Sequence, residues 1–364
     1  MENGGRGKVH IVNPLWDPCG GSEWRSIETW RLLRPHCDAR LWSEYEPAPE
    51  LAGWVPHTRI APWRLRIPRG GTLVFVGTYF RIGHWIRFAA PERVVLIYNT
   101  DQPDRLRKNL TRIASCGRSA EVLYTSPSLR RMEHGHGPVL ESLVDPARFS
   151  YRLRSRERPF TVGRFSRDTL DKHHDEDGAL WRALAAEGMR VRIMGGTCLA
   201  KRLAGVPNIE LLAAGAEDPE TFLHSLDCFV YRTADSWFEG FGRVVIEAMA
   251  TGLPVVCGER GGYADFLTPG RDGVLVGSTA QAIEAARGIR DNPEQARRLG
   301  ANAAWTAAML HRGTVERTLH LLLGRRAPVT ARATAASTYV KLLAETRALT
   351  ARRRAASSPP SRSR

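Results

Sequence analysis

The stretch from Asp227 to Val276 limits what this chain can fold into more than any other. It reads DCFVYRTADSWFEGFGRVVIEAMATGLPVVCGERGGYADFLTPGRDGVLV. Cys228–Arg232 is a short β-branched and aromatic run, which is typical of a buried strand. A polar loop leads into a compact helix at Arg243–Ala250, Gly252 stands where a helix end needs a positive φ, and Val255–Gly258 begins the next strand. The segment therefore predicts one strand–loop–helix–strand crossover of a parallel sheet.

The loop before this helix has the features of a ligand site. Loops at the carboxyl ends of parallel strands are where open α/β sheets bind ligands. Gly240, Phe241 and Gly242 enter the helix, so free amide groups and a positive helix end face an incoming anion. Glu239 lies in the loop and Glu247 deeper in the helix. Two acceptor groups on either side of an anion-binding helix start suit a nucleotide-diphosphate sugar, which has hydroxyls at both ends and phosphates between them.

Glu239 and Glu247, within EGFGRVVIEAMATGLPVV, resemble the signature of the retaining GT-B glycosyltransferases, specifically glycosyltransferase family four. The resemblance implies an α/β fold of two Rossmann-like domains whose parallel sheets face each other across a cleft. It implies that Glu239 and the following amides hold the sugar hydroxyls and that Glu247 holds the ribose hydroxyls. Asp265 stands where the family more often has Glu. Two solvated glutamates in an ordinary crossover are the alternative, which the length of the matching pattern disfavours.

The segment VGRFSRDTLDKHH resembles the family's strand followed by Gly-Arg and a later Lys. By that match Arg164 and Lys172 grip the diphosphate, with Arg167 as the substitute for Lys172. Two cations there would neutralise the charge that grows as the sugar departs. The resemblance thus implies Glu239, Arg164 and Lys172 as catalytic residues, and as donor-binding residues Gly20, Gly21, Gly240, Phe241, Gly242 and Glu247. It implies transfer with retention of configuration, no cofactor beyond the nucleotide-sugar co-substrate, and no metal.

The first half of the chain alternates strand-like and helix-like runs, as a parallel sheet requires. Strands are expected at Lys8–Asn13, Ala39–Ser43, Thr72–Gly77, Arg93–Asn99 and Glu121–Ser126, and helices at Ser22–Leu33, Tyr79–Ala90 and Asp101–Ala114. Gly20 and Gly21 form a tight turn and Ser22 is expected to cap the first helix. Glu44–Arg69 is expected to be irregular, either as an acceptor-side loop or as plain surface.

Many members of the resembled family place a His after the strand that corresponds to Arg93–Asn99. This chain has Asn99 there, which can hydrogen-bond a sugar but cannot act as a base. His84 is better interpreted as a surface or core histidine. The run HHDEDG (173–178) contains Asp-x-Asp, a spacing that can hold a metal, but helix-start acids complement the helix dipole and a solvated helix start is the favoured interpretation. The absence of GxGxxG in the sequence argues against a nicotinamide dehydrogenase.

The predicted organisation has four parts. Residues 1–150 form the acceptor-side domain, 151–158 the linker, and 159–323 the nucleotide-sugar domain, whose last helix crosses back to the first domain in GT-B proteins. Residues 324–364 form a basic tail that is partly disordered. This tail has ten Arg or Lys and one Glu, which is +9 of the net +15. The excess positive charge is therefore mainly a property of the tail, which is either solvated or in contact with an anionic membrane. Nucleic acid is a disfavoured partner.

Six cysteines at 19, 37, 116, 198, 228 and 257 show no CxxC spacing and are expected to be free thiols in a reducing compartment. With no apolar signal segment visible, a cytoplasmic location is expected, with peripheral contact at the inner membrane face left open. The predicted function is transfer of a sugar to a glycan, lipid or small-molecule acceptor. The alternatives are a non-catalytic nucleotide-sugar or glycan binder that uses the same cleft, and an interaction protein that acts through the basic tail.

Overall fold

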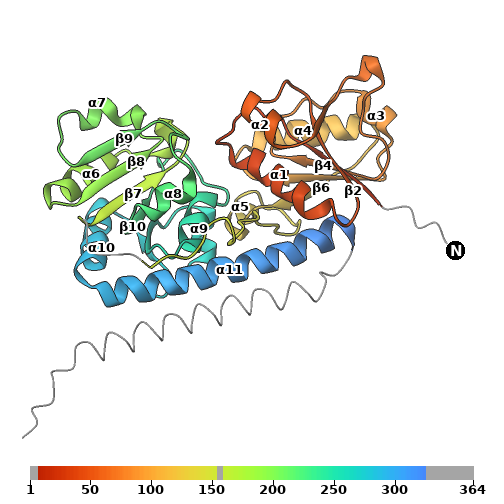
Figure 1. Cartoon of the computed structure of the whole chain (residues 1–364). Coiled ribbons are helices and arrows are strands. Elements are labelled where there is room, and N and C mark those ends of the chain that lie inside the picture. The colour runs from red at the N-terminus through yellow and green to blue at the C-terminus, as the bar shows by residue number, and fades with distance from the viewer. Residues whose placement is uncertain (1–6, 154–158, 325–364) are drawn as a thin grey trace, which may run out of the picture.

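The computed structural model describes residues 7–153 and 159–324, which form two α/β lobes (Figure 1). Each lobe contains one sheet of six parallel strands. The strand orders are β3-β2-β1-β4-β5-β6 in the first lobe and β12-β11-β10-β7-β8-β9 in the second. The predicted fold, two Rossmann-like domains with parallel sheets, is confirmed.

The strands of the first lobe are β1 (Lys8–Val12), β2 (Asp38–Ser43), β3 (His57–Arg59), β4 (Thr72–Val76), β5 (Arg93–Tyr98) and β6 (Glu121–Tyr124). Its helices are α1 (Gly21–Leu33), α2 (Pro49–Trp54), η1 (Pro62–Arg64), α3 (Trp85–Ala89), α4 (Pro103–Ser115) and α5 (Pro127–Met132).

The strands of the second lobe are β7 (Thr161–Phe165), β8 (Arg190–Met194), β9 (Ile209–Leu212), β10 (Cys228–Tyr231), β11 (Val255–Gly258) and β12 (Val274–Val276). Its helices are η2 (Leu170–Lys172), α6 (Asp177–Ala186), η3 (Thr197–Leu199), α7 (Ala200–Leu203), α8 (Pro219–His224), α9 (Arg243–Ala250), η4 (Gly262–Phe266), α10 (Thr279–Asp291) and α11 (Pro293–Leu323).

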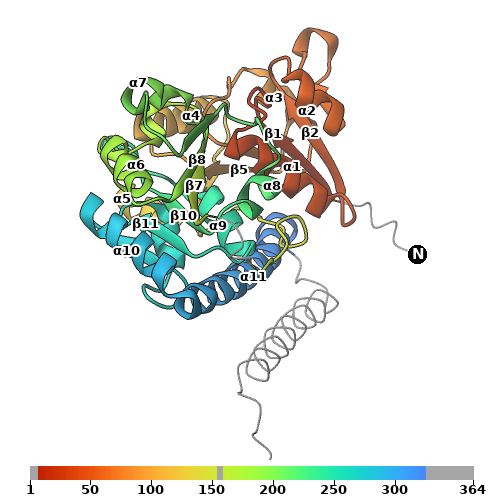
Figure 2. The ribbon, with the colours of Figure 1, turned by 60° about the vertical axis from the view of Figure 1, so that its left-hand side comes forward.

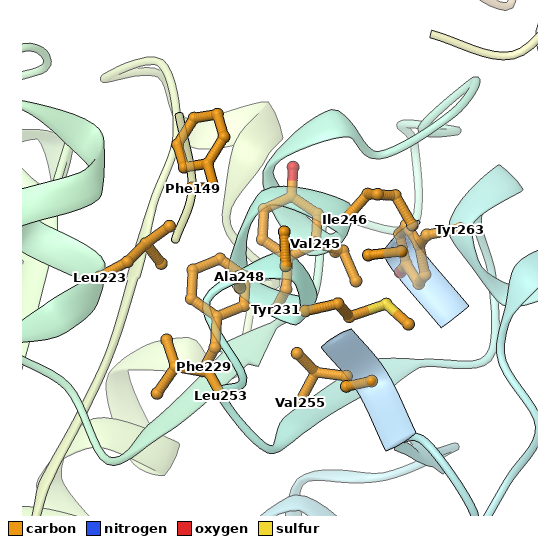
Figure 3. Packing of buried hydrophobic residues seen from close by; sticks show 14 of the residues in the cluster. Phe149, Leu223, Phe229, Tyr231, Val245, Ile246, Ala248, Leu253, Val255 and Tyr263 are labelled. Atoms are coloured by element: carbon orange, nitrogen blue, oxygen red, sulfur yellow. The ribbon is translucent and has the colours of Figure 1, made fainter. Parts of the chain in front are cut away.

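Apolar side chains on both faces of the central strands explain why both sheets are covered by helices on two sides. In β4, Leu73 and Phe75 belong to one buried cluster, while Val74 and Val76 belong to the cluster on the opposite face. Strands buried on both faces are nearly continuous hydrophobic runs, which is the pattern that made them recognisable in the sequence. In the second lobe, Figure 3 shows one such face, where α9 packs onto β10 and β11.

Helix α11 runs beneath both lobes and joins them (Figure 1). In its first half Ala303 and Ala307 pack into the core of the second lobe. Near its end Leu319 and Leu322 pack into the core of the first lobe. The expected return of the last helix to the first lobe is therefore observed, because one amphipathic helix supplies apolar surface to two cores.

Three local predictions for the first lobe are wrong. The expected helix at Tyr79–Ala90 is helical only at Trp85–Ala89, because Tyr79 packs against aromatic and arginine side chains of neighbouring loops. The stretch Glu44–Arg69 is not irregular throughout, since it holds α2, β3 and η1 and buries Leu51, Val55, Ile60 and Ile67. Ser22 does not cap α1. Gly20 occupies the cap position, without a side-chain hydrogen bond.

Candidate functional site

The loop between β10 and α9 forms the second-lobe side of the cleft, as predicted. Helix α9 covers Arg243–Ala250 and Gly252 has a φ of +76°, in agreement with the sequence interpretation. Gly242 has a φ of +77°, and a Cβ atom there would collide with the Tyr263 ring. Glycine is required at Gly242 by both backbone conformation and close packing. Within the described residues, the N–H groups of Phe241 and Gly242 have no hydrogen-bond partner, so they are available to an anion at the start of α9.

Two adjoining cavities lie between the lobes. The smaller has a volume of about 320 Å³ and the larger about 590 Å³. Residues that line both are Gly21, Arg167, Lys172, Glu239 and Arg243. Of the remaining predicted site residues, the smaller cavity is lined by Gly20, Asn99, Gly240, Phe241 and Gly242, and the larger by Glu247. The structure therefore brings together all predicted site residues except Arg164 along one trough.

A buried ion pair between Lys172 and Glu239 lies where the two cavities meet. The Lys172 Nζ atom is 2.6 Å from Glu239 Oε2, and the Tyr231 hydroxyl donates to the same oxygen at 2.9 Å. Burial acts to raise the pKa of the Glu239 carboxyl, but Lys172 and Tyr231 outweigh it and hold that pKa below its ordinary value. Burial lowers the pKa of Lys172, with Glu239 opposing the shift. The pair places an amino group and a carboxyl group beside the start of α9.

Arg164 is not in the cleft, and its predicted grip on a diphosphate is wrong for this structure. Its side chain is fully buried and pairs with Asp177 Oδ2 at 3.2 Å. It also donates to the carbonyl oxygens of Arg232 and Lys172 and stacks over the Tyr231 ring. It therefore supports the backbone on which Lys172 sits. Arg167, which the sequence offered only as a substitute cation, lines both cavities.

Glu247 lines the larger cavity. It also belongs to a row of ion pairs that runs from α9 through Arg243 to Glu28 in the first lobe. Arg243 donates to Glu247 Oε1 at 2.6 Å and forms a two-point pair with Glu28 of α1 at 2.5 and 2.7 Å. Burial raises the pKa of Glu247, while the Arg243 guanidinium opposes that shift. Arg243 thus connects the helix that carries the predicted ribose-binding carboxylate to the first lobe. Neither Arg243 nor Glu28 was predicted from the sequence to be a site residue.

The first-lobe side contains a buried carboxyl that sequence reasoning missed. Glu23, in the first turn of α1, lines the smaller cavity and accepts a hydrogen bond from the Ser22 hydroxyl at 2.7 Å. Gly20 packs closely against this carboxyl, since a Cβ atom at Gly20 would collide with Glu23 Oε2. Burial raises the pKa of Glu23 to about 7, although Ser22 lowers it. An acid beside two glycines is an ordinary helix start in sequence, so no signal distinguished it.

Asp265, which stands where the resembled family more often has Glu, makes a contact that the sequence did not predict. Its carboxylate accepts from the Ser128 N–H and hydroxyl, both at 2.7 Å, and lies 3.0 Å from Arg131. Because Ser128 and Arg131 belong to α5 of the first lobe, Asp265 ties the two lobes together. Its place is an inter-lobe contact.

The residues of the HHDEDG run serve structural contacts. Asp177 pairs with Arg164, and the His173 Nε2 atom lies 2.9 Å from the Gly195 carbonyl oxygen. Among residues 7–153 and 159–324, no group of three or more His, Cys, Asp or Glu side chains is arranged to hold a metal ion. His84 is exposed and lines neither of the two cavities, which agrees with its interpretation as a surface histidine.

Searches against known proteins add a family match over the second lobe. Residues 193–305 match the family described as Glycosyl transferases group 1, a range that includes the loop, α9 and both glutamates. The chain carries a glycosyl transferases group 1 domain. Several curated relatives match locally, two glycosyltransferases among them. A D-inositol 3-phosphate glycosyltransferase 2 of Catenulispora acidiphila is 40% identical over 85 residues, which is 21% of this chain and 20% of that protein. A GDP-mannose-dependent alpha-mannosyltransferase of Mycobacterium tuberculosis is 36% identical over 119 residues, 32% of this chain and 29% of that protein.

The solved structures extend the likeness from the group 1 domain to both lobes. The Anabaena HepE protein in complex with UDP-glucose superposes with a TM-score of 0.70 at 15% identity, covering 88% of this chain and all of that one. At that identity the likeness shows the fold, which is GT-B. The matched stretches span at most about a third of each curated relative described above. In the described part of the chain, no helix is both long and apolar enough to span a bilayer.

Proposed function

We propose that this protein is a retaining glycosyltransferase of family four, which moves a sugar from a nucleotide-diphosphate sugar to an acceptor hydroxyl. The observation that carries the proposal is the Lys172–Glu239 pair beside the free amides of α9, at the junction of two cavities between the lobes. The matched group 1 domain and the GT-B fold support the same class of enzyme.

The donor would occupy both cavities. The nucleoside would lie in the larger cavity, where Glu247 would accept hydrogen bonds from the ribose hydroxyls. The diphosphate would lie against Lys172, Arg167 and the start of α9, all of which favour negative charge. The sugar would extend into the smaller cavity, where Glu239 and the Gly240–Gly242 amides meet its hydroxyls. Asn99 lines that cavity from the first lobe and is a further hydrogen-bonding group for the sugar.

The chemistry would be a front-face displacement. The bond between the anomeric carbon and the phosphate oxygen breaks while the bond to the acceptor oxygen forms on the same face. The acceptor's proton passes to the departing phosphate oxygen, so no strong protein base is needed, which suits Asn99 in the place of a histidine. Lys172 and Arg167 would stabilise the growing phosphate charge, so that transfer proceeds without a divalent metal.

The test uses the full purified chain with UDP- and GDP-sugars, measuring donor hydrolysis and transfer to candidate acceptors. Glu239→Gln should lower the rate about 10³-fold or more, because it removes an interaction that strengthens in the transition state, while leaving the far-UV circular dichroism unchanged. The anomeric configuration of the product, read by NMR, should match that of the donor, and EDTA should not reduce the rate.

Near-normal turnover by Glu239→Gln would contradict the proposed role. Nucleotide-sugar binding without turnover by the wild-type protein would favour the non-catalytic binder instead. The basic tail lies outside the described residues, and its contact with membranes stays a prediction.

A further inference from the structure

Three aromatic rings from three different loops of the first lobe form a cluster, and two of them, Trp16 and Tyr79, line the smaller cavity. Trp16 follows β1, Tyr45 follows β2 and Tyr79 follows β4. The Trp16 ring centre lies 5.1 Å from that of Tyr45 and 6.4 Å from that of Tyr79. Trp16 is 47% exposed and Tyr79 37% exposed, and both line the cavity that contains Glu239. Large rings left open at a cavity mouth are available to a ligand.

The rings are held in place before any ligand arrives. Leu15 has a φ of +56° although its side chain is fully buried, and this strained turn directs the chain at Trp16. The Leu15 N–H donates to the Asn13 side chain at 2.9 Å, and the Asn13 amide donates to the Val76 carbonyl at 3.1 Å. The Arg105 guanidinium stacks over Tyr79 at 4.3 Å. The cluster therefore does not need to be ordered by binding, which favours affinity.

The chemistry of this mouth combines aromatic faces with hydrogen-bonding groups. Asp17, Asn99 and Thr100 line the same cavity as Trp16. An acyl chain would leave these polar groups without partners, and a phosphate would gain nothing from an indole face. A pyranose ring satisfies both, because its C–H face packs on an aromatic ring while its hydroxyls point outward from the edge.

We infer that the cluster of Trp16, Tyr45 and Tyr79 is the acceptor subsite and that it takes a pyranose ring. This inference rests on the proposed function and names the class of its acceptor. The sugar ring would stack on Trp16, next to Tyr79, with the accepting hydroxyl directed toward Glu239 and Asn99.

The experiment compares Trp16→Ala and Tyr79→Ala with Trp63→Ala, a matched exposed tryptophan of the same lobe that lines neither cavity. Methyl glucoside, galactoside and mannoside serve as probes by saturation-transfer NMR and as acceptors in transfer assays. UDP and GDP binding by calorimetry and donor hydrolysis in water are measured in parallel. We expect the first two variants to lose at least 10-fold in acceptor kcat/KM while donor binding and hydrolysis stay unchanged, and Trp63→Ala to behave as wild type.

The outcomes distinguish a failure of the acceptor-subsite inference from a failure of the proposed glycosyltransferase function. Unchanged acceptor kcat/KM in Trp16→Ala overturns the subsite, as does a wild-type protein that hydrolyses donor but binds none of the pyranosides. Absence of both donor binding and donor hydrolysis in the wild type would instead contradict the proposed function.

A second observation, independent of the cleft, concerns charge on the first lobe. Between Glu50 and Glu92 the chain has six arginines and no Asp or Glu. Within this acid-free segment, Trp63 and Leu65 are each 75% exposed and Phe88 is 73% exposed. Elsewhere on soluble surfaces such large apolar groups occur singly, whereas here they share one basic segment.

Two backbone contacts connect the stretches that carry these three apolar side chains. Trp63 and Leu65 lie on the turn around η1, which is closed by a bridge between Ala61 and Arg66. The following loop is tied to α3, the helix of Phe88, by the bond from the Gly70 N–H to the Ala89 carbonyl at 2.8 Å. In Figure 1, α3 lies at the edge of the first lobe far from the second lobe, and Figure 2 shows the same elements turned by 60°.

The geometry points to an anionic bilayer surface as the partner of this η1–α3 patch. Tryptophan, phenylalanine and leucine enter the headgroup region, and exposed arginines such as Arg64, Arg66 and Arg87 pair with lipid phosphates. A bilayer supplies both an apolar layer and anionic headgroups. The protein would lie on the membrane through this patch.

Vesicle co-sedimentation of the full chain tests this patch, with phosphatidylcholine vesicles and with vesicles containing about a third phosphatidylglycerol. We expect the wild type to bind only the anionic vesicles, less strongly at high salt, and Trp63→Ser/Leu65→Ser/Phe88→Ser to lose at least fivefold in binding. Met132→Ser, an exposed apolar residue outside the patch, is the control and should bind as wild type. Wild-type binding by the triple variant would assign any attachment to the tail and overturn the patch, as would a wild type that binds neither vesicle.

Discussion

On the second-lobe side of the cleft, Lys172 and Glu239 form a largely buried ion pair, whereas on the first-lobe side Trp16 and Tyr79 are partly open to solvent. Lys172 and Glu239 pair next to Gly240 and Gly242, where a Cβ atom would collide with neighbouring residues. Trp16 and Tyr79 are half-exposed and contact residues from other loops. The second-lobe side is thus pre-set for one charged ligand, while the first-lobe side offers a surface that loop changes can adapt. This division fits an enzyme with a fixed donor and a variable acceptor.

The largest effect is expected from replacing the two arginines near Lys172. Arg164 should matter for stability and Arg167 for nucleotide binding. Arg164→Met should lower the free energy of unfolding by about 3–5 kcal/mol, because Asp177 and two carbonyl oxygens lose their buried partner. Arg167→Met should leave the melting temperature close to wild type but weaken UDP or GDP binding about 10-fold. Calorimetric melting and titration measure both. An Arg164→Met protein that melts normally yet loses nucleotide affinity would restore the role that the sequence suggested.

The buried carboxyl on the first-lobe side should make stability depend on pH. The pKa of Glu23 is about 7 in the folded chain, against an ordinary value of 4.5. Between these values the folded state keeps a proton that the unfolded state has released, so this group's contribution to stability falls as pH rises from about 4.5 to 7. Glu23→Gln should therefore gain about 1–3 kcal/mol over wild type at pH 8 and almost nothing at pH 4. Thermal melts at both pH values measure the gain, and a Glu23→Gln protein less stable than wild type at pH 8 would contradict it.

Weakening the ion pair between Glu28 and Arg243, which joins the lobes, should change the free energy of unfolding least. Glu28→Gln weakens its two-point contact with Arg243, which keeps Glu247 as a partner. We expect a loss of about 1–2 kcal/mol, since both side chains are mostly buried. Glu46→Gln, whose pair with Arg59 is exposed, is the control and should change stability by less than about 0.5 kcal/mol. Equal melting temperatures for the two variants would show that the contact does not hold the lobes together.

Much of the fold could be predicted because its signals are local. Strand β10, helix α9 and Gly252 were identified within one or two residues, since β-branched runs, a compact helix and a glycine at its end depend on neighbours in sequence. The helix at Tyr79–Ala90 was overestimated for the opposite reason: contacts of Tyr79 with Trp16 and Arg105 overrule its helical propensity. The assignment of retention and of family four stays a prediction that the enzymatic assays address.

By itself, the sequence determined two parallel sheets and the residues around the start of α9. Both depend on residues that are close together in the chain, namely hydrophobic runs and glycines at helix ends. Only the tertiary structure decided that Arg164 faces the core while Arg167 faces the cleft. Asp177 and the Arg232 carbonyl draw the first guanidinium inward, and both come from elsewhere in the chain. It also decided that Trp16, Tyr45 and Tyr79 meet, since the carboxyl ends of separate strands converge only when the sheet has formed.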